Sequence, residues 1–155
     1  MRKTLFETNS TGTTEAQIRW LDCCQLCTAQ ISSEDPGFPL ENALRVDCET
    51  GWRAATPGRQ QIKLTFDSPQ HIKHVQLKFV EVNVPRSQEF ALFVTTLTGR
   101  KEVLRQQWSF SPSGSTTEIE DYSWDLRDVV AVELELDPGR HDKEVFASLE
   151  AFLLG

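Results

Sequence analysis

The 155-residue sequence has no long hydrophobic run and a deficit of positive charge. No stretch approaches the roughly 18 consecutive apolar residues that a membrane-spanning helix needs, so we expect no membrane association. The chain has 16 Lys and Arg residues against 23 Asp and Glu residues, a formal net charge of −7. Because nucleic-acid binding depends on cationic side chains that neutralise phosphates, this balance argues against a nucleic-acid ligand.

The sequence also lacks the short motifs of the common enzyme classes. Its three histidines, His71, His74 and His141, form no His-Glu-x-x-His metal motif, and no Gly-x-Ser-x-Gly motif or dinucleotide fingerprint occurs. The carboxylates between Glu118 and Asp137 alternate with apolar residues, which is typical of solvated strand faces rather than of a glycosidase pair. We therefore expect no catalytic residues, no cofactor and no enzymatic activity.

The amino-terminal residues lack the apolar segment of a secretory leader. Arg2 and Lys3 are followed by Glu7 and by a Ser/Thr-rich stretch, so we expect a cytoplasmic protein. We interpret residues 1–21 as a polar extension and residues 22–155 as one domain, since a chain of this length can bury a single core.

The sequence has four cysteines, and we expect no disulfides between them in a reducing compartment. They are Cys23, Cys24, Cys27 and Cys48. The Cys24-x-x-Cys27 spacing is half of a zinc motif, but no second cysteine pair or histidine pair follows at the usual distance. The segment is predicted as a strand, in which residues three apart point to opposite faces. We therefore expect no metal site and interpret the thiols as small core residues.

Alternating apolar and polar residues predict β-strands along most of the chain. The alternation is clear over residues 62–66, 75–79, 90–94 and 130–136, and an apolar closing strand is predicted over residues 145–154. Pro and Gly residues mark turns between these segments. Short strands at this spacing are typical of an antiparallel β-sandwich or barrel.

A distinctive succession of elements occupies residues 26–66. A strand that ends in small polar residues leads into a Glu-Asn-Ala-Leu helical turn, an Asp-containing turn and a Thr-x-Trp step. The residues that carry this succession are Leu26–Asp35, Phe38–Leu44, Asp47, Thr50, Trp52 and Gln61–Asp67. The succession resembles the opening of the discoidin-type, or galactose-binding-like, domain family. Ala147–Phe152 resembles the last strand of that family, so the resemblance extends over about residues 22–155.

The resemblance implies an all-β fold, an eight-stranded antiparallel jelly-roll β-sandwich. Members of the family are mostly non-catalytic and bind sugars, phospholipid headgroups or proteins through loops at one end. Within the family, Glu41-Asn42 and Trp52–Ala55 are most similar to the amino-terminal domain of the eukaryotic single-strand-break repair scaffold. That similarity implies a domain that binds a polymerase and broken DNA.

Many sugar-binding members of the family hold a structural calcium ion beside this turn, and one expected ligand is missing here. Alignment on Thr50 and Trp52 places Arg45 where the family has an aspartate, whereas Asp47 and Glu150 match. Because a guanidinium repels calcium, we expect no metal ion. We expect Arg45 to pair with Asp47 or Glu150 and to tie the turn to the last strand. The alternative is that Arg45 points to solvent and Asp47 caps a turn locally.

Several side chains of the predicted loops have the types that bind sugars. An aromatic platform for the C–H face of the ring and planar polar groups for its hydroxyls are the usual combination. The ligand-binding candidates are Arg53, Arg86, Gln107, Trp108 and His141. For Trp108 the alternative is core packing on a strand face shared with Phe110, and for the arginines it is simple exposure to solvent.

The sequence thus predicts a non-catalytic ligand-binding module with three candidate ligands. Carbohydrate is favoured by a small margin, on the family resemblance and the residue types in the loops. The alternative is intracellular protein–protein interaction, supported by the repair-scaffold similarity and the polar extension, which would order on a partner or on a second copy of the chain. DNA ends come third: the charge of −7 argues against them, although a local patch of Arg45, Arg53, Arg59 and Arg86 could overcome the overall field.

Overall fold

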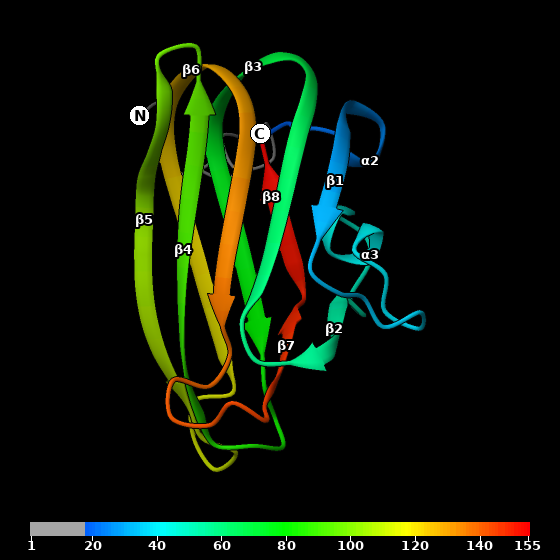
Figure 1. Cartoon of the computed structure of the whole chain (residues 1–155), viewed down its shortest axis with the longest axis vertical. Helices are drawn as coiled ribbons and strands as arrows, with labels where there is room; N and C mark the ends of the chain where they lie inside the picture. The colour runs from blue at the N-terminus through cyan, green and yellow to red at the C-terminus, as the bar shows by residue number, and fades with distance from the viewer. Residues whose placement is uncertain (1–17) are drawn as a thin grey trace, which may run out of the picture.

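The computed structural model describes residues 18–155, which form a sandwich of two β-layers (Figure 1). Its elements in chain order are α2 (Cys23–Leu26), β1 (Cys27–Ile31), α3 (Glu41–Leu44), β2 (Trp52–Pro57), β3 (Gln60–Val80), β4 (Arg86–Thr96), β5 (Gly99–Phe110), β6 (Thr117–Asp137), β7 (Phe146–Leu149) and β8 (Ala151–Leu154). All strand pairs are antiparallel. The predicted all-β sandwich is confirmed, and so is the helical turn at Glu41–Leu44.

Two long strands, β3 and β6, run through both layers. Each is 21 residues long, and the first half of β3 pairs with the second half of β6 while the second half of β3 pairs with the first half of β6. Register shifts between Thr65 and His74 mark the bend. On one side of the bend the order is β1-β3-β6-β4-β5, and on the other side β3 pairs with β8. The sequence predicted two separate strands at 62–66 and 75–79. The structure joins them, because the turn residues Asp67–Pro69 form an irregular bend instead of ending the pairing.

The closing segment forms two short strands instead of the single predicted strand. β7 pairs with β2, whereas β8 pairs with β3, and Glu150 lies between them. The Glu150 backbone N–H donates to the Lys78 carbonyl oxygen at 2.8 Å, and the Glu150 carboxylate lies 3.0 Å from Lys78 Nζ. The chain therefore changes its pairing partner at Glu150, and β7 diverges from β3.

The core lies between the two layers and includes the predicted core residue Trp52, which is fully buried. Its Nε1 donates to the Ser33 carbonyl oxygen at 3.2 Å, so the one polar atom of the ring has a partner. The preceding residue, Gly51, has φ +67°, and a Cβ at this position would lie 2.5 Å from the Leu149 carbonyl oxygen. Only glycine allows β2 to approach β7 this closely.

The first described residues of the chain lie against its carboxy-terminal strand, β8. The Leu21 N–H donates to the Leu154 carbonyl oxygen at 2.6 Å, and the Trp20 ring contacts His74 edge-on. The rest of the predicted extension, residues 1–17, lies outside the described residues. The strand predicted around Cys24 is wrong, because Cys23–Leu26 is a helical turn and the strand begins only at Cys27. All four cysteines are free thiols.

A chain of polar side chains crosses the interior between β4 and β6. Arg86 Nη1 donates to Gln88 Oε1 at 2.7 Å, and Gln88 Nε2 donates to Glu118 Oε1 at 2.9 Å. Glu118 is completely buried. Burial, followed by a hydrogen bond with Glu120, raises the pKa of Glu118 to about 8. Glu118 therefore keeps its proton in the folded state at neutral pH.

This protonation makes stability depend on pH. Between about pH 4.5 and 8 the carboxyl of residue 118 loses its proton in the unfolded chain but keeps it in the folded one, so its contribution to stability falls as pH rises. We expect the Glu118→Gln variant, which keeps the neutral shape, to have a melting temperature several degrees above that of the original chain at pH 8.5 and close to it at pH 5. Calorimetry at both pH values checks this, and a difference that does not grow with pH would contradict it.

Candidate ligand-binding groove

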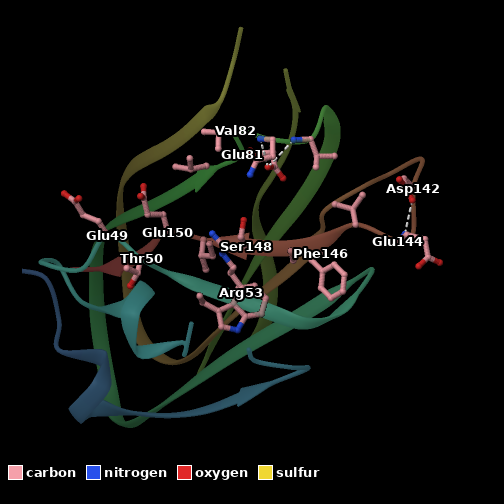
Figure 2. Close-up of a pocket in the computed structure, with 17 residues that line it drawn as sticks. Glu49, Thr50, Arg53, Glu81, Val82, Asp142, Glu144, Phe146, Ser148 and Glu150 are labelled. Carbon is pink, nitrogen blue, oxygen red and sulfur yellow. Dashed lines mark hydrogen bonds between the residues drawn. The ribbon is translucent and has the colours of Figure 1, made fainter. Parts of the chain in front are cut away.

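A groove of about 490 Å³ opens at one end of the sandwich (Figure 2). One wall is β7 with the neighbouring β2, and the other is the segment 80–84 at the end of β3. The groove exists because β7 pairs with β2 alone, while the chain pairs with β3 only after Glu150. The divergence of β7 from β3 leaves a space that no strand of the described chain fills.

The side chain of Glu81 shapes the wall opposite β7. Its Oε2 accepts hydrogen bonds from the backbone N–H groups of Asn83 at 3.1 Å and Val84 at 3.4 Å. Its Oε1 accepts from Arg86 Nε at 2.9 Å. The Arg86 side chain is 1% exposed and also donates to the Pro138 carbonyl oxygen at 2.9 Å. Glu81 thus fixes the turn 81–84 and compensates a buried guanidinium at the same time.

Three exposed apolar side chains surround the groove. Val82 is 56% exposed, Val84 43% and Phe146 52%. Val82 and Phe146 stand on opposite walls (Figure 2). Exposed large apolar side chains that converge on one hollow mark a binding site more often than scattered ones do.

The charges on the groove are mostly negative. Five carboxylates and one cation belong to the lining: Glu49, Glu81, Asp142, Glu144, Glu150 and Arg53. Glu81 and Glu150 are paired with Arg86 and Lys78. The Arg53 guanidinium lies 4.1 Å from the centre of the Phe38 ring. The groove therefore combines exposed apolar side chains with excess negative charge.

The structure separates the predicted ligand-binding residues. Arg53 lines the groove, whereas Arg86 and His141 line a neighbouring cavity of about 330 Å³. Gln107 is exposed on β5, where Arg140 Nη1 donates to its Oε1 at 3.0 Å. Trp108 packs against the core, and its Nε1 is buried, so its ring does not form an exposed platform.

The predicted ion pair of Arg45 does not form. The Arg45 side chain is exposed and takes part in no ion pair of residues 18–155, and Asp47 is exposed as well. Glu150 pairs with Lys78 at 3.0 Å. Arg45, Glu150 and Lys78 line one cavity of about 500 Å³, but the cation that reaches the carboxylate comes from the strand paired with β8. The predicted pairing of Arg45 with Glu150 or Asp47 is therefore wrong, and Arg45 is exposed as in the alternative interpretation.

Within residues 18–155, no group of three His, Cys, Asp or Glu side chains converges in a way that would hold a metal ion. No helix of that range has the length and apolar character required to cross a membrane.

Sequence reasoning did not identify Phe146, Val82 or Val84 as site residues. Phe146 belongs to the closing segment 145–154, for which the sequence predicts an apolar, buried strand. It is exposed because it is the first residue of β7 and lies at the rim of the groove. The available signal was the run Val82-Asn83-Val84-Pro85, which places two valines in a predicted loop where burial is not expected.

Comparison with known proteins identifies both a family and a fold. The family model described as the XRCC1 N terminal domain matches residues 24–116, more than half of the chain. No curated protein sequence matches significantly.

Solved structures share the fold at low sequence identity. The family 32 carbohydrate-binding module of C. perfringens NanJ, solved with galactose, is 11% identical with a TM-score of 0.60, over 87% of this chain and 96% of that one. A family 32 module of a family 31 glycoside hydrolase from Clostridium perfringens is 15% identical with a TM-score of 0.63, over 87% and 93%. Reduced XRCC1 bound to the DNA pol beta catalytic domain is 17% identical with a TM-score of 0.59, over 89% and 97%. These matches confirm the galactose-binding-like jelly-roll fold.

The ion pair behind the groove wall supports a stability prediction. We expect Glu81→Ala to destabilise the chain by about 3 kcal/mol, because it leaves the buried Arg86 guanidinium without its carboxylate. The control is Glu102→Ala, which removes an exposed partner of Arg105 and should change stability little. Urea unfolding measures both, and equal stability of the two variants would contradict the role assigned to Glu81.

Proposed function

The chain belongs to the XRCC1 N-terminal domain family, and from that premise we propose that it is a non-catalytic module that binds a segment of a partner protein in the groove between β7 and residues 80–84. Sugar-binding and protein-binding domains share this sandwich, so the choice between the two ligand classes has to be argued from the residues of the groove. The cytoplasmic location expected from the sequence belongs to the same proposal.

The observation that carries the proposal is the composition of the groove rim. Val82, Val84 and Phe146 offer apolar contacts on both walls, and carboxylates surround them. An apolar centre with a polar rim is the usual anatomy of a protein-binding surface. The excess of carboxylates favours a segment that carries Lys or Arg beside apolar side chains.

A sugar ligand has weaker support in the same geometry. Trp52 is buried under the groove, and Trp108 is partly buried, packs against the core and does not line the groove, so neither presents a ring face there. Phe146 does present one, beside Arg53 on the neighbouring strand. This pairing keeps carbohydrate as the competing ligand, to be separated by experiment.

The test uses the folded chain as bait in two parallel screens, a phage-displayed peptide library and a glycan array. We expect the library to yield peptides with micromolar dissociation constants, and Phe146→Ala to weaken their binding at least tenfold in titration calorimetry. The matched control is Ile119→Ala, because Ile119 is 57% exposed on β6 and does not line the groove.

Three outcomes would overturn the proposal. Binding of glycans without peptides would assign the groove to carbohydrate. Peptides that bind the original chain and Phe146→Ala equally well would place the protein-binding site elsewhere. If neither screen yields a ligand, the proposal that this groove binds a ligand is wrong.

A further inference from the structure

We propose that the partner segment binds the groove as an extended strand that pairs with the free edge of β7. This inference rests on the proposed function, since it specifies how the same groove holds a protein segment. An edge strand presents a row of N–H and C=O groups, and pairing of an added strand with such a row is a recurring mode of peptide recognition.

The backbone of β7 has one edge without a strand partner in the described chain. β7 and β2 form a two-stranded sheet, and neither pairs with another strand. The four residues of β7 all belong to the groove lining. The free edge of the strand therefore faces the space that a ligand would occupy.

Alternation along the strand identifies the groups that point into the groove. The Val145 carbonyl oxygen accepts from Gly58 N–H at 2.9 Å on the β2 side, and the Glu150 N–H donates to Lys78 on the opposite side. In a strand, the N–H and C=O of successive residues point to opposite edges. Residues 145, 147 and 149 thus face β2, and Phe146 and Ser148 direct their N–H and C=O groups into the groove.

On the wall across the groove, several backbone N–H groups already have partners. The backbone N–H groups of Asn83 and Val84 are held by the Glu81 carboxylate, and the Glu81 N–H donates to the Thr116 carbonyl oxygen at 2.8 Å. The turn 81–84 therefore stays folded on itself. A segment that enters the groove would pair on the β7 side and contact Val82 and Val84 with its side chains.

Charge specifies the chemistry of this segment. Glu49, Asp142 and Glu144 line the groove and take part in no ion pair among residues 18–155. Asp142 and Glu144 lie in the turn just before β7, where the Glu144 N–H donates to Asp142 Oδ1 at 2.9 Å (Figure 2). A strand with Lys or Arg at alternate positions would place cations beside these carboxylates and apolar side chains toward Phe146. The segment is thus a basic, alternating strand of a partner protein.

The probe for this mode is a synthetic, end-blocked octapeptide that alternates lysine and valine, tested on the full chain. Two further versions carry N-methyl groups on the lysine amides or on the valine amides, which removes N–H donors from one edge and keeps every side chain. We expect the unmethylated peptide to bind with a micromolar to submillimolar dissociation constant and at least one methylated version to lose tenfold or more. We also expect slower hydrogen exchange at Phe146 and Ser148 on binding.

Charge reversal gives an independent check on the contact between the basic side chains of the segment and the groove carboxylates. Glu144→Lys should weaken binding of the unmethylated peptide at least fivefold, whereas Glu41→Lys, an exposed position on α3 outside the groove lining, should not. If both variants weaken binding equally, the net charge of the chain explains the effect. The proposal that the carboxylates before β7 contact the basic side chains of the segment would then be wrong.

The two proposals fail in distinguishable ways. If Phe146→Ala weakens the peptide but both methylated versions bind as tightly as the parent, strand pairing is wrong and the groove still binds protein segments. If the alternating peptide does not bind while library peptides do, the strand chemistry proposed here is wrong. If Phe146→Ala changes neither kind of binding, both proposals are wrong.

Discussion

The change of pairing partner at Glu150 is the constraint on which the groove depends. One residue before it, Leu149 pairs with Trp52 of β2, and one residue after it, Ala151 pairs with Lys78 of β3. The backbone hydrogen bond and the ion pair between Glu150 and Lys78 hold this point. If the chain continued along β3 as one closing strand, it would fill the space between β3 and β2, and no groove would remain.

The opposite wall depends on a different kind of interaction, a buried charge that must be compensated. Arg86 is almost fully buried, and burial lowers its pKa from the ordinary value while its hydrogen bond to Glu81 opposes that shift. Because an isolated buried charge is costly, Glu81 has little freedom to move away from Arg86. The same carboxylate holds the turn 81–84 through the backbone N–H groups of Asn83 and Val84. A preformed wall lowers the entropic cost of binding a flexible segment.

The sequence was sufficient for the fold and insufficient for the site. Strand alternation is a local pattern and predicted an antiparallel sandwich or barrel, whereas the jelly-roll sandwich came from the family resemblance. The Glu-Asn-Ala-Leu segment predicted the helical turn at Glu41–Leu44. The division of the closing segment at Glu150 depends on which strand each half contacts, and no local pattern encodes that. The pairing of Glu150 with Lys78 instead of Arg45 has the same origin, since Lys78 reaches the carboxylate only through the β3–β8 register.

The groove also shows why resemblance of fold does not transfer a ligand. Trp108 was a reasonable sugar platform by type, yet its position on the inner face of β5 places the ring against the core. Phe146 was a reasonable core residue by type, yet its place at the rim exposes it. Trp108 thus follows the core packing that its strand face shared with Phe110 suggested, whereas Phe146 departs from the burial expected of the closing strand. Since one fold can carry different ligands on its loops and rims, the ligand of this chain must be argued from its own rim. Here the rim combines two valines, a phenylalanine and several carboxylates with an open strand edge, and these properties support the basic extended segment proposed above.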